Sequence, residues 1–489
     1  MHPVIAQINI NKKDKHPVYL QLAAQLSGFI QTGNLKKGER LPGSRALAAA
    51  LQLHRKTVVS AYEELTAQGW LESRSGSGTY VTRRLPEMKL PSYTPVKKNA
   101  TDKAGFVFSS PPHLETRVLK PVPLLHLDDG FPDPRIAPLA ELSRAYRSQL
   151  LTGNPYLRLG YSDTKGALWL RQELSPYLNH TRGLQTTPES ILITRGTMMG
   201  LYLASTALLQ RGDHVAVGRL SWSGANMNFL QAGAKLVPVP IDDHGMDVQA
   251  LEKICRRKKI RLLYTTSHHN YPTTVALRAE RRLQLIRLAE QYGFIIFEDD
   301  YDYDFHYAGR PLLPLAGSDS NGMVLYCGSF TKTISPALRV GYFTGPENII
   351  TQMAKLRRII DRQGDTILEN AVASMLRNGI IQRHLKKSLK IYRERRDIFC
   401  GLLTKKLPDA ISFRVPDGGM SVWAQFSSRL DLKELSQRAF KKDLYITDGI
   451  GYTLDGSPVN ALRLGFASST LEELAKAVDV LVSLLKKKK

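Results

Sequence analysis

The sequence has few cysteines. Its 489 residues include only three, Cys255, Cys327 and Cys400, and they lie far apart. An odd number of cysteines at such spacing forms neither a disulfide framework nor a zinc cluster. Proteins of oxidising compartments usually carry paired cysteines, so we expect this chain to work in a reducing cytoplasm.

Long apolar runs are also missing. No stretch of the sequence is long enough to cross a bilayer, and its first residues lack the pattern of a secretory signal peptide. We therefore expect no membrane segment. Hydrophobic residues make up 43% of the chain and charged residues 23%, which is typical of a globular protein. A chain of this length predicts two or three domains.

Acidic residues are scarce relative to basic ones. The chain has 68 Lys and Arg against 44 Asp and Glu, which gives a net charge of +24 and a pI of about 9.8. The basic excess is denser in the first 105 residues than in the rest. A strongly basic chain suits a polyanionic partner, so the charge favours double-stranded DNA.

Two common nucleotide-binding motifs are absent as well. No Gly-x-Gly-x-x-Gly opens a helix after the first strand of the back part of the chain, and no Walker A sequence occurs. The interpretation of this chain as a protein that binds a dinucleotide or a nucleoside triphosphate therefore loses its main support.

The front of the chain predicts a helix-turn-helix. Apolar residues recur at helical spacing in three segments, residues 18–30, 44–51 and 55–68. We expect Ser44 to be the N-cap of the second helix. The third helix begins with basic and hydroxyl residues, which suits entry into the major groove. Two β-prone runs flank a Gly/Ser turn at residues 75–78 and predict a hairpin, or wing. The alternative is a small helical bundle that contacts protein.

These residues form a known pattern, namely Tyr19-x-Gln21, Leu41-Pro42-x-Ser44-Arg45-x-Leu47-Ala48, Arg55-x-Thr57-Val58-x-x-Ala61-Tyr62-x-x-Leu65, Gly69-Trp70-Leu71 and Gly76-Ser77-Gly78-Thr79-Tyr80-Val81. Over about 65 residues the stretch closely resembles the winged helix of GntR-type bacterial regulators. The resemblance implies DNA contacts by Arg45, Arg55, Lys56, Thr57, Ser75, Gly76 and Ser77. His54 stands where the family usually has Ser, which leaves the base preference open.

Behind this domain, expected at residues 1–84, lies a proline-rich segment with little periodicity. It predicts an extended linker over residues 85–123. Strand-like and helix-like runs then alternate over residues 124–489. The expected strands are residues 190–194, 214–217, 235–239, 260–264, 294–297 and 323–327. This alternation predicts a mostly parallel sheet with helices on both faces.

A lysine, Lys332, follows the last of these strands. A lysine at the mouth of a strand suits a cofactor that carries an aldehyde and a phosphate, because its amine can form a Schiff base. Ser329, Thr331 and Arg339 offer hydrogen bonds and a positive charge to the phosphate. The alternative is a surface lysine in a polar loop.

An acidic run, Glu298-Asp299-Asp300-Tyr301-Asp302, ends the strand at residues 294–297. Ligands of open α/β sheets bind at such strand ends. Asp299 can keep a pyridine nitrogen protonated, and Tyr301 can hydrogen-bond a phenolic oxygen. A divalent metal is the rival ligand for this many acids, although no His or further carboxylate cluster completes such a site.

Other strand ends carry further candidates. Residues 194–198 join a strand to a helix, whose free N–H groups can accept a phosphate. Trp222 can stack on a ring, and Asn270 can reach a ring oxygen. Arg463 lies inside an apolar run, so it either pairs with an acid or binds the carboxylate of a ligand.

Together with Asn154-Pro155-Tyr156-x-x-x-x-Gly160-Tyr161 and Gly166-x-x-x-Leu170-Arg171, these candidates resemble the fold-type I enzymes that use pyridoxal 5'-phosphate (PLP), of the aminotransferase class. Joined to a GntR-type winged helix, the chain resembles a MocR-type transcriptional regulator. The resemblance implies an α+β winged helix-turn-helix, then a large α/β aminotransferase-like domain. A small C-terminal α+β subdomain is expected from about residue 375.

The resemblance also assigns roles. Lys332 would hold PLP, Asp299 would pair with its ring nitrogen, and Tyr301 with its phenolic oxygen, whereas Asn270 stands where Gln is common. Trp222 would stack on the ring where the family usually has Tyr. The phosphate would be held by Gly196, Thr197, Met198, Ser329, Thr331 and Arg339. Arg463 would bind an effector carboxylate. Thr274, where Gly is common, leaves effector identity and transamination open.

We therefore expect a homodimeric, PLP-dependent regulator of transcription. It would sense PLP or a small amino compound, in vitamin B6 or amino-acid metabolism. One competing hypothesis is an active aminotransferase with an accessory DNA-binding module. Another is a DNA-binding protein whose back domain serves only dimerisation.

Overall fold

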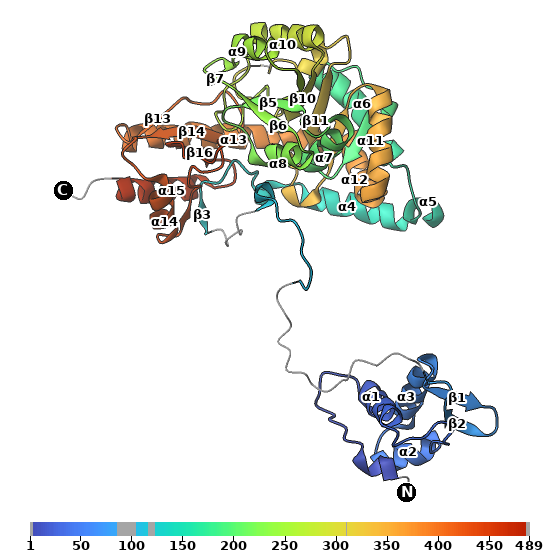
Figure 1. The fold of residues 1–489 in the computed structure, drawn as a ribbon. Coiled ribbons are helices and arrows are strands. Elements are labelled where there is room, and N and C mark those ends of the chain that lie inside the picture. The colour runs from blue at the N-terminus through green and yellow to red at the C-terminus, as the bar shows by residue number, and fades with distance from the viewer. Residues whose placement is uncertain (1–2, 86–103, 116–122, 310, 486–489) are drawn as a thin grey trace. The chain divides into compact units, whose positions relative to one another are not determined.

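The computed structural model describes residues 3–85, 104–115, 123–309 and 311–485. The chain divides into two units, Met1–Ser109 and Ser110–Lys489, which Figure 1 draws with their helices and strands labelled. Much of the predicted linker lies outside the described residues, and its bounds stay a prediction. None of the helices in the described part of the chain has the length and apolarity that a membrane span needs.

The first unit packs three helices against a hairpin. The helices are α1 (Val18–Gln31), α2 (Ser44–Leu51) and α3 (Arg55–Ala67). Strands β1 (Leu71–Arg74) and β2 (Gly78–Val81) pair antiparallel, with Leu71 opposite Val81. Val58, Leu65 and Trp70 are among the buried side chains of its core. The predicted helix-turn-helix and wing are confirmed.

The start of α2 differs from the prediction. Gly43 is the N-cap, no side chain caps the helix, and Ser44 is the first helical residue. The Ser44 hydroxyl instead accepts a hydrogen bond from Arg55 Nε at 3.5 Å, which links α2 to α3. His54 caps α3, because its Nδ1 accepts from the Lys56 amide at 3.2 Å.

Seven strands form the central sheet of the second unit, in the order β4-β12-β11-β10-β9-β5-β6. Their bounds are β4 (Ile191–Thr194), β5 (His214–Gly218), β6 (Lys235–Val239), β9 (Ile260–Thr265), β10 (Ile295–Asp300), β11 (Val324–Ser329) and β12 (Gly341–Thr344). All neighbours are parallel except those of β12, which runs antiparallel to β4 and β11. The predicted mostly parallel sheet is confirmed.

Helices cover both faces of this sheet, because side chains alternate along each strand. Leu192, Val217 and Phe343 face a core formed with α7 (Thr197–Leu208), α8 (Ser223–Gln231) and α11 (Glu347–Ile360). The alternate residues of the same strands face helices on the other side of the sheet. These helices are α4 (Leu139–Leu151), α6 (Leu168–Arg182), α9 (Val248–Cys255), α10 (Ala279–Tyr292) and α12 (Thr366–Arg377).

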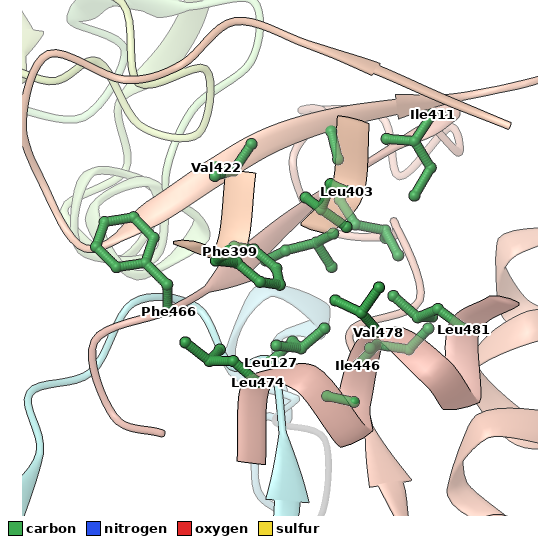
Figure 2. Packing of buried hydrophobic residues seen from close by; sticks show 14 of the residues in the cluster. Leu127, Phe399, Leu403, Ile411, Val422, Ile446, Phe466, Leu474, Val478 and Leu481 are labelled. Carbon is green, nitrogen blue, oxygen red and sulfur yellow. The ribbon is translucent and has the colours of Figure 1, made fainter. Parts of the chain in front are cut away.

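A smaller subdomain follows the long helix α13 (Ile380–Lys406). Its sheet joins β13 (Ile411–Phe413), β14 (Ser421–Phe426) and β16 (Ala461–Gly465) in antiparallel pairs. Helices α14 (Leu432–Phe440) and α15 (Leu471–Leu485) complete it. Figure 2 shows its core, in which Phe399 and Leu403 of α13 lie near Val422 and Val478.

The first strand of the second unit packs against this small core. Strand β3 (Leu125–His126) runs parallel to β15 (Leu444–Tyr445). The next residue, Leu127, is fully buried near Leu474 of α15 (Figure 2). This anchor fixes the residues that follow, 128–131, which border the site described next.

Candidate functional site

A cavity of about 280 Å³ lies where parallel strands of the central sheet end. Most of the predicted site residues line it: Thr197, Met198, Trp222, Asp299, Tyr301, Ser329, Thr331, Lys332, Arg339 and Arg463. The topology brings them together because the carboxyl ends of parallel strands meet at one edge of a sheet. A larger groove of about 630 Å³, beside residues 273–280 and 412–417, contains none of them.

Lys332 lies on the loop after β11 and is half-buried. Its Nζ donates to the Gly130 carbonyl at 2.6 Å and lies 4.4 Å from the centre of the Phe131 ring. Burial lowers the pKa of the Lys332 amine. A lowered pKa increases the neutral fraction, and the neutral amine is the form that attacks an aldehyde.

Asp299, one residue before the end of β10, offers a free acceptor. Its Oδ2 accepts from the Tyr264 hydroxyl at 2.8 Å, whereas its buried Oδ1 accepts no hydrogen bond from the described residues. Burial raises the pKa of Asp299 to about 7, against the lowering effect of Tyr264 and Thr197. A buried carboxyl oxygen that lacks a donor fits the protonated nitrogen of a pyridine ring.

The neighbouring acids are directed to other partners. Glu298 accepts from backbone amides at 2.9 and 3.0 Å, and Asp300 accepts from the Tyr326 hydroxyl. Asp302 Oδ1 lies 2.8 Å from His269 Nδ1. These carboxylates do not converge on one point. In the described part of the chain, no three His, Cys, Asp or Glu side chains are grouped so that they could hold a metal ion.

The N-terminus of α7 also borders the cavity. Gly196 is the N-cap with φ 72°, and a Cβ there would lie 2.9 Å from Nη2 of Arg339. Gly341 of β12 approaches the same turn, since its Cβ would lie 2.8 Å from the Gly196 Cα. Ser329 Oγ donates to Thr331 Oγ1 at 2.7 Å. Free N–H groups, a guanidinium and two hydroxyls together suit a phosphate.

Trp222 and Asn270, the two residues predicted to contact a cofactor ring, differ in their position relative to the cavity. Trp222 lines the cavity, and its indole covers Gly224, where a Cβ would lie 2.6 Å from the ring. Asn270 does not line the cavity, because its Nδ2 donates to Thr273 Oγ1 at 2.9 Å within its own loop. Tyr271, the next residue, lines it instead. The lining of the cavity does not support the predicted contact of Asn270 with a ring oxygen.

The cavity also contains residues that the sequence did not single out, namely Asp129, Phe131, Tyr264, Thr266 and Tyr271. Tyr264 and Thr266 lie at the end of β9, so a search of all strand ends would have found them. Asp129 and Phe131 follow the predicted linker, where nothing local indicates contact with the sheet.

Arg463 lines the cavity and pairs with an acid of the same chain, whereas its binding of a ligand carboxylate stays a prediction. It is only 2% exposed, and its Nε lies 2.9 Å from Asp129 Oδ1. Its Nη1 donates to the Pro272 carbonyl at 3.1 Å. The Tyr271 hydroxyl donates to Asp129 Oδ2 at 2.9 Å. Burial raises the pKa of Asp129, and Arg463 and Lys332 act against that rise.

In the first unit, the predicted DNA contacts lie at the starts of α2 and α3 and on the wing. The exposed ones are Arg45, Arg55, Lys56, Ser75, Gly76 and Ser77. Thr57 is half-buried. Gly76 has φ 70°, which a tight turn requires, and Ser77 Oγ lies 2.7 Å from the Tyr80 hydroxyl. Basic helix starts beside a wing suit the major groove and its backbone.

Known proteins share this arrangement. Residues 18–81 match the family of bacterial regulatory proteins called gntR, and residues 141–481 match the class I and II aminotransferases. The chain is 28% identical over 479 residues to the probable rhizopine catabolism regulatory protein MocR of Rhizobium meliloti, covering 96% of this chain and 93% of that protein. The chain belongs to the MocR-type transcriptional regulators.

Two further comparisons agree with this MocR-type assignment. The pyridoxine biosynthesis transcriptional regulator PdxR of Corynebacterium glutamicum is 31% identical over 397 residues, which are 80% of either chain. An archaeal alanine:glyoxylate aminotransferase superposes with a TM-score of 0.71 at 28% identity, covering 75% of this chain and 92% of that one.

This MocR-type regulator therefore joins a DNA-binding domain to an aminotransferase-like domain. Membership of the aminotransferase family indicates PLP as the cofactor of the second domain. The side chains present fit that group: an amine on Lys332, a free buried oxygen on Asp299 and a phosphate cradle at the start of α7.

Proposed function

We propose that this MocR-type regulator senses PLP, or an amino compound that reacts with bound PLP, and that the second unit passes the signal to the winged helix. One observation carries the proposal: the Lys332 amine and the free Oδ1 of Asp299 belong to the same cavity. An amine for an aldehyde and an acceptor for a ring nitrogen are the two groups that PLP needs most.

Bound PLP would supply an aldehyde and an electron-withdrawing ring. Lys332 would hold the aldehyde carbon, Asp299 the ring nitrogen and Tyr301 the phenolic oxygen, with Trp222 against the ring face. The phosphate would be held by Gly196, Thr197, Met198, Ser329, Thr331 and Arg339. Asn270 leaves this set because its amide is bonded within its own loop.

The names of the relatives support two kinds of signal. PdxR is named for pyridoxine biosynthesis, which supports PLP itself and a role in vitamin B6 metabolism. MocR is named for rhizopine catabolism, which supports a small organic compound as the alternative. A ligand can act only through different affinities for two states of the protein, so the signal must favour one arrangement of the regulator on DNA.

We also infer a homodimer that works in the cytoplasm, where it meets its DNA. Helix α5 (Pro155–Leu159) leaves Tyr156 88% and Leu157 78% exposed. Tyr161 nearby is exposed too, and the Arg362 guanidinium lies 4.0 Å from the centre of its ring. Exposed apolar patches usually mark interaction sites. A second copy would cover this one and present two winged helices to two half-sites.

The first test separates cofactor binding from DNA binding with two variants. Lys332→Ala should lose the visible absorbance that PLP gives to the purified protein, while it still binds DNA flanking its own gene. Lys235→Ala, which removes an exposed lysine of β6, should keep that absorbance. If Lys332→Ala leaves the spectrum unchanged, the cofactor assignment is wrong.

Arg55→Ala should behave in the opposite way. Loss of a groove contact should weaken DNA binding about tenfold or more, with the visible spectrum unchanged. Arg393→Ala removes the same charge from an exposed position of α13 in the other unit, so it controls for net charge. Footprints with and without PLP then show whether PLP is the signal.

A second candidate function is transamination, because the cavity combines Lys332 with Asp299. Incubation of the PLP-loaded protein with L-alanine and a keto acid distinguishes the two functions. Many turnovers for each site would favour an enzyme, whereas a single conversion would favour a sensor. A back domain that serves only dimerisation would take up no PLP and stay colourless.

A further inference from the structure

The carboxylate position of Arg463 is already filled by a carboxylate of the same chain. Asp129 Oδ1 lies 2.9 Å from Arg463 Nε. The Tyr271 hydroxyl donates to the other oxygen of Asp129 at 2.9 Å, and the Arg463 guanidinium lies 4.8 Å from the centre of the Tyr271 ring. Lys332, Asp129 and Arg463 all line the cavity. An internal acid therefore holds the group that a ligand carboxylate would need.

Asp129 is held in this place by a built turn. The buried Asp128 accepts from the Gly130 and Phe131 amides at 2.8 and 2.9 Å, and its other oxygen accepts from the Ser468 hydroxyl at 2.6 Å. Gly130 has φ 87°, and a Cβ there would lie 3.4 Å from Arg463 Nη2. The left-handed turn brings the backbone against the guanidinium, and Asp129 comes with it.

A ligand that carries a carboxylate meets a cost at this position. If it takes Arg463, it must displace Asp129, whose side chain then keeps a hydrogen bond from Tyr271 alone among the described residues. If it stays beside Asp129, two like charges lie side by side. An amine that has no carboxylate meets neither cost, because it needs only the bound PLP.

We propose that Asp129 is a specificity-determining residue that occupies the carboxylate position of Arg463, so that the cavity selects PLP alone or amines without a carboxylate over α-amino acids. The inference rests on the proposed function, because the amine must reach PLP in this cavity. It narrows the class of effector, because Asp129 repels ligands that carry a carboxylate.

The test compares two probes that differ only by a carboxylate, ethylamine and L-alanine. Calorimetric titration of the PLP-loaded full-length protein gives both dissociation constants. Asp129→Asn should improve the affinity for L-alanine, relative to ethylamine, about tenfold or more. The reason is that the Arg463 guanidinium becomes free to bind the carboxylate of L-alanine. Adding Arg463→Met to Asp129→Asn should abolish the gain. An unchanged ratio, or a gain that persists without Arg463, would overturn the inference.

A second arm needs no PLP and so separates this inference from the proposed function. Acetate should raise the melting temperature of cofactor-free Asp129→Asn and leave the wild type and the double variant unchanged. An equal rise of the melting temperature in the wild type and the variant would contradict the inference that Asp129 occupies the carboxylate position. Failure of the wild type to take up PLP counts against the proposed function alone. If Asp129→Asn does not fold, judged by circular dichroism, Asp129→Ser takes its place.

Discussion

At the scale of the residue, neighbours in the acidic run take opposite roles because they point to opposite faces of the sheet. Asp299 lies opposite Cys327 in the register and bonds Tyr264 on the face toward the cavity. Asp300, one residue on, bonds Tyr326 on the other face. Strand alternation therefore decides which carboxylate meets a ligand.

The first residue-scale prediction concerns the proton on Asp299 in the cofactor-free protein. Its pKa is raised from 3.8 to about 7 by burial. Between these values the folded state holds a proton that the unfolded state has lost, so stability falls as the pH rises through this window. Asp299→Asn removes this effect. Above the window, the free energy of unfolding of the variant should therefore rise relative to that of the wild type by about 1.4 kcal/mol for each unit by which the pKa is raised.

Urea unfolding at a series of pH values measures this gain. Asp409→Asn, a change at an exposed aspartate, should follow the wild type at every pH. A difference between Asp299→Asn and the wild type that stays constant from pH 4 to pH 7 would contradict the assignment of a buried, protonated Asp299.

At the scale of the element, the proposed phosphate cradle depends on how closely β12 approaches the start of α7. Gly341→Ala would place a Cβ 2.8 Å from the Gly196 Cα, a backbone atom that cannot rotate away. The start of α7 must then shift, at a cost of about 1–3 kcal/mol. We expect the affinity for PLP to fall about tenfold or more, and the affinity for pyridoxal, which has no phosphate, to fall less.

Absorbance titration of the cofactor-free protein with both compounds gives the ratio. Gly345→Ala is the matched control, because its Cβ would meet the end of the Leu325 side chain, which can move. If Gly341→Ala lowers the affinities for PLP and for pyridoxal equally, α7 does not hold the phosphate.

The same scale explains what the sequence could and could not predict. The parallel strands are apolar runs, and their ends locate Asp299 and Lys332 by local pattern alone. Strand β12 was missed because four residues that begin with Gly341 carry a weak signal. Asp129 and Tyr271 escaped for another reason. Their contact, across 142 residues of sequence, depends on tertiary packing that no local pattern encodes.

At the scale of the whole molecule, an early and a late segment of the second unit meet at the cavity. Its first strand, β3, pairs with β15, and Asp129 after it pairs with Arg463 of β16. The segment that carries Asp129 is also the one that follows the predicted linker to the winged helix. A ligand that displaces Asp129 therefore acts close to the first strand of the second unit, which follows the predicted linker.

The last prediction concerns assembly. Leu157→Asp places a charge on the exposed apolar face of α5, and a second copy that covers this face would have to bury it. We expect the wild type to sediment as a dimer and the variant as a monomer, with a dissociation constant raised at least about a hundredfold. Leu283→Asp, at a 54% exposed position of α10, should remain dimeric. A monomeric wild type, or a dimeric Leu157→Asp, would show that no second copy covers α5, and the proposal of two half-sites would lose its support.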